Sequence, residues 1–229
     1  MKAGADGIIA LIPAYNEERF IGDVVRGALK HLPVVVIDDG STDRTAQVAE
    51  EAGAVVIRQA VNSGKGVALN TGFDYAVSRD VDAAITLDAD GQHAPDEIPL
   101  FVEAFRAGKG DIIIGKRDFS QMPGKNQFGN RVGTRLLTLA MGQPVPDNQS
   151  GYRLLSREVL RACRPTSQRF EAEVEILLRA QLNGFRITWV PIKTIYNDKV
   201  SHFRPVRDSA LFLGMVNRIW QARRRGSFD

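Results

Sequence analysis

Short apolar runs alternate with amphipathic segments along the first 115 residues, and this alternation restricts the fold more than any other feature. The runs Ile8–Ile12, Val34–Ile37 and Ala83–Leu87 have the length of strands and contain many β-branched residues. Segments with helical spacing, such as Glu17–His31, lie between successive runs. Buried strands that alternate with helices predict an α/β domain with a parallel sheet covered on both faces.

The alternation breaks after Gly115, where the sequence becomes polar and rich in glycine up to residue 131. We expect three more helices in this part of the chain, at about 129–141, 171–182 and 206–223. One more strand is expected at about 186–190, between the second and third of these helices. No internal repeat or low-complexity linker divides the sequence. We therefore predict a single domain over residues 1–229.

The composition is that of an ordinary globular protein, with 44% hydrophobic and 25% charged residues. The single cysteine, Cys163, excludes a disulfide within the chain and leaves no zinc spacing, so we expect a reducing cytoplasm. No apolar run approaches the length of a membrane-spanning helix. Residues 202–229 hold six Arg and two Asp in a chain of net charge +3, so the basicity lies in the tail. This distribution argues against a nucleic-acid partner.

Acidic and amide side chains follow three predicted strands, in Pro13-Ala-Tyr-Asn-Glu17, Asp38-Asp-Gly-Ser41 and Asp88-Ala-Asp-Gly-Gln92. The carboxyl ends of parallel strands meet at one edge of a sheet, where ligands bind. Carboxylates gathered there repel each other unless a cation, a base or a ribose lies between them. Asp90 and Gln92 offer the hard oxygen ligands that Mg²⁺ or Mn²⁺ requires. Helix capping is the alternative role for such acids.

Two common nucleotide-binding motifs are missing. The turn after the first strand lacks the Gly-x-Gly-x-x-Gly of dinucleotide-binding folds. The segment Asn62-Ser-Gly-Lys-Gly66 is not a P-loop, because Gly66 stands where a Ser or Thr is needed.

The motifs resemble, in order, those of the family 2 glycosyltransferases with the GT-A fold, and most closely the dolichyl-phosphate mannosyltransferases and their bacterial polyprenyl-phosphate relatives. The resemblance covers about residues 8–200 and implies a Rossmann-like, mostly parallel sheet. It also implies a nucleotide-sugar-binding half at about 8–115 and an acceptor half at about 116–205, followed by a basic amphipathic helix at about 206–229. The motifs that carry it are the three strand-end segments above, Asn62-Ser-Gly-Lys-Gly66 and Ser150-Gly-Tyr-Arg153.

The resemblance assigns one group of residues to the donor and its metal. Asp90 and Gln92 are expected to hold Mg²⁺ or Mn²⁺ on the diphosphate, with His202 as a further candidate ligand. Asp88, Asp90 and Arg117 are the expected catalytic residues. The residues expected to bind the nucleotide sugar are Pro13, Tyr15, Glu17, Ile37, Asp39, Lys65, Asp88, Ala89 and Lys199.

A second group is assigned to the acceptor, which the resemblance identifies as a polyprenyl phosphate of the dolichyl or undecaprenyl type. Arg131, Ser150 and Arg153 are expected on the acceptor side. An attacking phosphate is already ionised at pH 7 and needs no general base. The alternative acceptor, a hydroxyl of a glycan or polysaccharide, would need one, and Glu171, Glu173 and Asp147 are the candidates.

The expected activity is metal-dependent transfer of a sugar, with inversion, from a UDP- or GDP-sugar. The residues do not distinguish uracil from guanine, nor do they name the sugar. A non-catalytic nucleotide-sugar-binding protein is the alternative of another class, and the intact Asp90 and Gln92 count against it.

The tail predicts contact with a membrane. Apolar residues recur at helical spacing there, and Arg223, Arg224 and Arg225 follow them. Such a helix can lie on an anionic bilayer, so we expect a peripheral protein at the inner face of the membrane, in cell-envelope synthesis. Packing of this helix onto the domain or onto a partner is the alternative. The apolar residues are Leu211, Phe212, Met215, Val216, Ile219 and Trp220.

Overall fold

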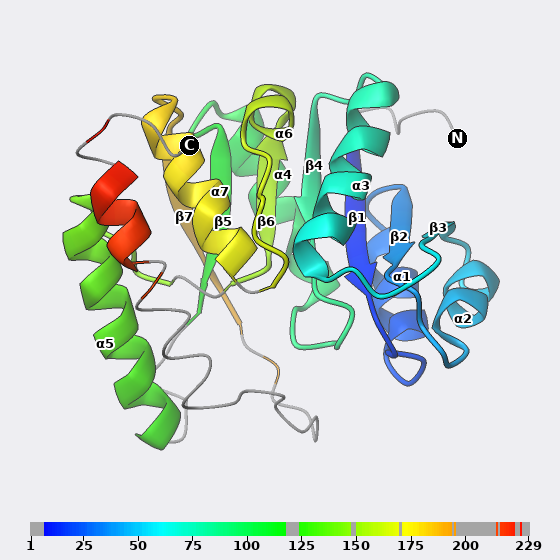
Figure 1. The fold of residues 1–229 in the computed structure, drawn as a ribbon. Helices are drawn as coiled ribbons and strands as arrows, with labels where there is room; N and C mark the ends of the chain where they lie inside the picture. Colours follow the sequence, from blue (N-terminus) through cyan, green and yellow to red (C-terminus); the bar gives the residue numbers. More distant parts are fainter. Residues whose placement is uncertain are drawn as a thin grey trace.

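A seven-stranded sheet forms the centre of the computed structural model (Figure 1). The structure describes residues 7–117, 124–147, 150–169, 171–193, 195, 214, 216–222 and 225, with the backbone alone for 124–132. The strand order is β3-β2-β1-β4-β6-β5-β7. All neighbouring strands are parallel except β6, which runs antiparallel to both β4 and β5. The strands are β1 (Ile8–Ala14), β2 (Val34–Asp38), β3 (Val55–Arg58), β4 (Ala83–Thr86), β5 (Ile112–Arg117), β6 (Arg153–Ser156) and β7 (Ile187–Ile192).

Helices cover both faces of the sheet, and each face has its own apolar core. On one face lie α1 (Ile21–Leu29), α2 (Thr45–Glu51) and α4 (Ile98–Arg106), which follows the short 3₁₀ helix η1 (Pro95–Glu97). On the other face lie α3 (Lys65–Ser78), α5 (Gly124–Met141), α6 (Arg157–Ala162) and α7 (Glu171–Leu182). The strands between the two cores are almost wholly apolar, as expected for strands that are buried on both faces.

The structure confirms the predicted α/β class and most of the predicted elements. The bounds of α7 agree with those read from its apolar spacing. The predicted helix at 129–141 begins earlier, at Gly124. Two elements were not predicted at all, the antiparallel strand β6 and the short helix α6 that follows it directly.

The described part of the C-terminal helix packs onto the domain. Ile219 and Ala222 are buried in the same core as α3, α5 and α7, and Val216 packs against it. Trp220 is exposed, as are Arg218 and Arg225. Packing of this helix onto the domain, the alternative interpretation of the tail, therefore accounts for some of the apolar residues at helical spacing. The other apolar residues of the predicted tail helix, Leu211, Phe212 and Met215, lie outside the described residues.

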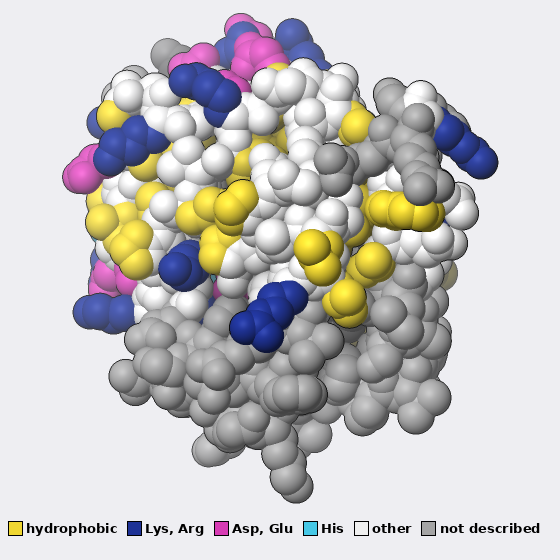
Figure 2. Space-filling view, turned by 90° about the vertical axis from the view of Figure 1, so that its left-hand side faces the viewer, with side chains coloured by type: hydrophobic (Ala, Val, Ile, Leu, Met, Phe, Trp, Pro, Cys, Tyr) yellow, Lys and Arg dark blue, Asp and Glu magenta, His cyan; other side chains and the backbone are white. Residues whose placement is uncertain are grey.

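Figure 2 shows the face that bears α5 and the C-terminal helix. Hydrophobic side chains lie over the middle of this face, basic side chains lie both there and at its margin, and acidic side chains lie at its upper and left margin. Among the described helices, none is both long and apolar enough to cross a membrane.

Glu175, in the middle of α7, is a buried carboxylate that holds the loop before the helix. Its Oε1 accepts hydrogen bonds from the backbone N–H of Thr166 (2.9 Å) and from Arg179 Nε (2.9 Å), and its Oε2 accepts one from Ser167 N–H (2.9 Å). Burial alone would raise the pKa of Glu175, but these donors outweigh it and lower the pKa. Gln168, the next residue of the loop, accepts a hydrogen bond from Gly66 in the first turn of α3 (3.0 Å). Glu175 thus fixes the position of that loop against α3.

Replacing Glu175 by glutamine should lower the free energy of unfolding by about 1–3 kcal/mol at pH 7, because buried donors lose a charged partner. A carboxylate with a depressed native pKa contributes its full stabilisation above its unfolded pKa of about 4.3 and loses it as the pH falls through the native value. The difference between wild type and Glu175→Gln should therefore be constant above about pH 5 and shrink at lower pH. Urea titrations at several pH values measure it, and a difference that stays equal from pH 7 to pH 3 would contradict the account.

Candidate active site

The loops that follow β1 and β2 are joined into one surface by hydrogen bonds. Asn16 N–H donates to Ser41 Oγ (3.0 Å), and Thr42 N–H donates to Asn16 Oδ1 (2.9 Å). Asn16 has a positive φ of 54°, which its short polar side chain tolerates. Glu17 N–H donates to Thr45 Oγ1 (2.8 Å), and Tyr15 beside it is exposed. Tyr15 and Glu17 of the first motif therefore lie in a loop at the carboxyl edge of the sheet, with Tyr15 exposed to solvent.

Asp39 ties the glycine-rich segment to the end of β2. Its Oδ1 accepts a hydrogen bond from Ser63 N–H and its Oδ2 accepts one from Gly64 N–H, both at 2.8 Å. Gly64 has a φ of 96°, a conformation that favours glycine. The carboxylate of Asp39 thus orders the loop that leads into α3, and any contact with a nucleoside would use its remaining acceptor positions.

The other predicted donor residues differ in what they can present. Ile37 is fully buried and its side chain packs against Gly72 of α3, so only its backbone could face a ligand. Ala89 is also buried. Pro13 is partly buried and lines a cavity of about 10 Å³, roughly the space of one water molecule.

Lys65 is the first residue of α3, and its ammonium joins two carboxylates. Lys65 Nζ lies 2.6 Å from Asp88 Oδ1 and 2.6 Å from Glu173 Oε1. Burial alone would lower the pKa of Lys65 and raise that of Asp88, but their mutual attraction outweighs burial in both cases. The pKa of Lys65 is therefore raised and that of Asp88 is lowered, so both groups stay ionised. Glu173 is itself almost fully buried in the first turn of α7.

The carboxylate of Asp88 lies against the backbone of Gly151. A Cβ atom on Gly151 would stand only 2.5 Å from Asp88 Oδ1 and 2.6 Å from Oδ2. On another side, Asp88 N–H donates to His93 Nδ1 (3.3 Å). Burial lowers the pKa of His93, although Asp88 and Asp90 oppose this, so the imidazole is neutral and its Nδ1 acts as the acceptor. His93 also stacks on Tyr152, with 5.1 Å between ring centroids.

Asp90 and Gln92 follow in the turn after β4. Asp90 Oδ1 accepts a hydrogen bond from Gln92 N–H (3.0 Å), so the two residues are held together. Over the described residues, no group of three or more His, Cys, Asp or Glu side chains is arranged to hold a metal ion. Two hard oxygen donors with an incomplete shell fit Mg²⁺ or Mn²⁺, because such ions keep waters and take substrate phosphates as ligands. His202 lies outside the described residues.

Arg117, at the end of β5, is paired with Asp147. Its Nε lies 2.8 Å from Asp147 Oδ2, its Nη2 lies 2.9 Å from Oδ1, and Asp147 is fully buried. Burial alone would lower the pKa of Arg117, but the hydrogen bonds and charge of Asp147 outweigh it and raise the pKa. This bidentate pair fixes the direction of the guanidinium, which also feels the charges of Asp88 and Glu173.

The residues predicted for the acceptor side lie in different environments. Arg153 is buried at the start of β6, where its Nε donates to Ser150 O (2.7 Å) and its Nη1 donates to Glu173 O (2.6 Å). Ser150 is buried too. Their acceptor role stays a prediction, and the burial of both side chains disfavours it. Arg131 lies on α5 with its side chain outside the described part, and Lys199 is outside the described residues altogether.

Sequence reasoning missed the pairing role of two acids. The sequence predicts Glu173 and Asp147 only as candidate bases. In the structure both are buried partners of basic residues. The sequence carries no signal for these partners, because an acid in the first turn of a helix such as α7 is favoured by the helix dipole on a solvated surface as well.

Comparison with known proteins places this site in a family. The family model described as glycosyl transferase family 2 matches residues 9–164, and the chain belongs to that family of enzymes. A UDP-N-acetylglucosamine–dolichyl-phosphate N-acetylglucosaminyltransferase of Methanococcus voltae is 34% identical over 222 residues, with 85% of this chain and 88% of that enzyme covered. A polyprenol monophosphomannose synthase of Mycolicibacterium smegmatis is 29% identical over 201 residues, with 80% and 76% covered. Within the family, the chain is thus similar to enzymes named for transfer to dolichyl phosphate, polyprenol or undecaprenyl phosphate.

A solved structure supports the fold. Glucosyl-3-phosphoglycerate synthase of Mycobacterium tuberculosis, crystallised with Mn²⁺, UDP-glucose and phosphoglyceric acid, superposes with a TM-score of 0.75. The match covers 98% of this chain and 82% of that one, at 22% sequence identity. The predicted GT-A fold is confirmed.

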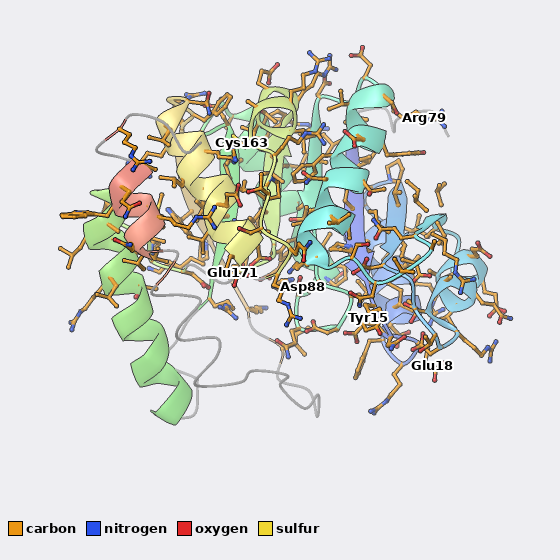
Figure 3. All side chains as sticks on the ribbon, viewed as in Figure 1. Tyr15, Glu18, Arg79, Asp88, Cys163 and Glu171 are labelled. Carbon is orange, nitrogen blue, oxygen red and sulfur yellow. The ribbon has the colours of Figure 1, made fainter. Side chains whose placement is uncertain are left out.

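Figure 3 shows Tyr15, Asp88 and Glu171 along the same edge of the sheet.

Gly151→Ala tests whether the position of Asp88 matters. The added methyl would push the carboxylate away from its place beside Lys65, because it would stand 2.5 Å from Asp88 Oδ1. We expect sugar transfer to fall by about tenfold or more, as displacement of a group by about 1 Å can cost far more than that. Gly214→Ala, where the backbone has no positive φ and a Cβ would meet nothing within 4 Å, is the matched control for adding a methyl group at a glycine. Unchanged kcat/KM in Gly151→Ala with a native melting curve would contradict the role of this contact.

Proposed function

We propose that this glycosyltransferase moves a sugar from a UDP- or GDP-sugar to a polyprenyl phosphate, with inversion at the anomeric carbon and with a divalent metal on the diphosphate. The observation that carries the choice of acceptor is the state of the candidate bases. Glu173 is buried against Lys65, and Asp147 is buried with both oxygens bound to Arg117. A general base must come within hydrogen-bonding reach of the acceptor, and neither carboxylate is presented for this.

A phosphate acceptor removes the need for a base. One of its ionised oxygens attacks the anomeric carbon as the bond from that carbon to the diphosphate breaks, and the electron pair leaves with the nucleoside diphosphate. Glu171, partly exposed in the first turn of α7, is the candidate base for the alternative hydroxyl acceptor. The names of the relatives from Methanococcus voltae and Mycolicibacterium smegmatis, which mention dolichyl phosphate and polyprenol, favour the phosphate.

The donor would lie along the ends of β1, β2 and β4. In this proposal, Tyr15, Glu17 and Asp39 contact the nucleoside, and Asp90 and Gln92 hold Mg²⁺ or Mn²⁺. The metal would supply positive charge where the diphosphate develops negative charge. Arg117 adds to this stabilisation from the end of β5, in a direction fixed by Asp147. The related enzyme crystallised with Mn²⁺ and UDP-glucose supports this assignment.

We further propose that the protein works at the inner surface of the membrane. The proposed acceptor is a lipid, and Trp220, Arg218 and Arg225 are exposed on the C-terminal helix. The face that bears this helix also carries hydrophobic and basic side chains (Figure 2). Each basic residue near an anionic surface contributes about 1 kcal/mol, and salt screens this attraction. Contact would therefore be peripheral and reversible.

EDTA should abolish sugar transfer, and Mn²⁺ or Mg²⁺ should restore it. Asp90→Ala should lower turnover by about 10²-fold or more, the scale for losing one main electrostatic stabiliser. Asp96→Ala removes an exposed acid six residues away and serves as the control. Full activity in EDTA would contradict the metal assignment.

Radiolabelled donor should transfer its sugar to undecaprenyl or dolichyl phosphate in anionic vesicles, and the product should be a lipid-linked sugar phosphate. The same vesicles with the corresponding free polyprenol should give no product, because no base activates the hydroxyl. Cosedimentation with the vesicles should decrease at high salt and in an Arg218→Glu/Arg225→Glu variant, while donor binding persists. Transfer to a free hydroxyl, dependent on Glu171, would overturn the proposed acceptor.

A further inference from the structure

Lys65 occupies a place that does not favour a basic residue. It is the first residue of α3, a helix of 14 residues with no acidic residue in its first turn. The positive end of the helix dipole disfavours a cation there. The side chain is nevertheless mostly buried, so other charges must hold it in place.

Two carboxylates from distant parts of the chain supply these charges. Asp88 follows β4, and Glu173 lies on α7, 108 residues after Lys65. Because each carboxylate oxygen lies 2.6 Å from Nζ, the two oxygens can be no more than twice that distance apart. Without the ammonium, the buried charge of Glu173 and the partly buried charge of Asp88 would face each other across this gap, which costs free energy.

Other contacts place the backbones of Asp88 and Glu173 independently of Lys65. Gly151 leaves room for Asp88, and His93 fixes the backbone of Asp88. On the other side, Arg153 is buried beside Glu173, bonded to its carbonyl oxygen, and its Nη2 lies 4.0 Å from Glu173 Oε2. The small cavity at this point is lined by Lys65, Asp88 and Glu173 among others. The carboxylate pair is therefore a preformed cation position, and the ammonium fills it.

We propose that Lys65 is a built-in counter-ion that closes this position to divalent metals, which makes Asp88 a positioning residue and not a metal ligand. The inference rests on the proposed function in one respect, namely that the metal belongs with Asp90 and the donor diphosphate. A tethered ammonium carries one charge and cannot dissociate, so the charge between β4 and α7 stays the same with or without donor. The divalent ion is then directed to the diphosphate.

The role of the ammonium can be measured without any sugar donor or acceptor. If the ammonium is removed, Asp88 and Glu173 should bind a divalent cation in its place. Oxygen ligands surround Mg²⁺, Mn²⁺ or Ca²⁺ at about 2.0–2.6 Å, a span that this pair can provide. Lys65→Met keeps most of the length of the side chain and removes its charge.

The experiment is a titration of the full chain with MnCl₂ alone, with free Mn²⁺ followed by electron paramagnetic resonance. We expect Lys65→Met to bind Mn²⁺ at least about tenfold more tightly than wild type, because two carboxylate ligands become available. The gain should disappear in Lys65→Met/Glu173→Gln and should be absent in Lys65→Arg, which keeps the charge. Lys109→Met removes an exposed lysine and controls for the change in net charge.

Equal Mn²⁺ affinity in wild type and Lys65→Met would overturn the proposal, and so would a gain that survives Glu173→Gln. If Lys65→Met does not fold in metal-free buffer, Mn²⁺ should restore its native circular dichroism, since an ion that binds only the native state stabilises it by mass action. Failure of Mn²⁺ to do so would also overturn it. A negative result here leaves the vesicle assay of sugar transfer unaffected, so the two proposals fail separately.

Discussion

The ion pairs around the ammonium of Lys65 hold the end of β4 to the start of α7, and the rest of the site depends on this connection. Burial of charges is costly, and it is tolerated only where each charge meets an opposite one in good geometry. Three bases and three acids among the described residues around this ammonium are paired in this way. The bases are Lys65, Arg117 and Arg153, and the acids are Asp88, Asp147 and Glu173. Removing any one of them leaves a charge without compensation.

The segment before β6 brings several parts of this arrangement together. Asp147 fixes Arg117, and Gly151 gives Asp88 its place. Arg153 is the first residue of β6, the strand that lies between β4 and β5. Because β6 is antiparallel, its first residue, and not its last, lies at the edge where the parallel strands end. One short stretch of chain therefore reaches the site from within the sheet, which explains how residues of the predicted acceptor half contact those of the donor half.

The sequence allowed the frame of the fold to be predicted, because β1, β2 and β4 are apolar over lengths typical of strands and α7 has apolar residues at helical spacing. It did not reveal β6, which has only four residues and begins with an arginine that suggests a surface position. The sequence likewise allowed the motifs to be predicted at the ends of strands. The pairing of Lys65 with Glu173 was not, since no local pattern records a contact across 108 residues. Charges that are buried together look the same in a sequence as charges on a solvated face.

The strand order also sets the order in which the sheet can be completed during synthesis. The four strands up to Thr86 neighbour one another, so they have their partners as soon as that part of the chain is made. By contrast, β5 pairs only with β6 and β7, which follow it in the chain. Domains begin to fold as they emerge from the ribosome. During synthesis, β5 therefore has no neighbouring strand until residues 153–156 have emerged. The ion pairs of Lys65 are complete only after Glu173 of α7 has emerged.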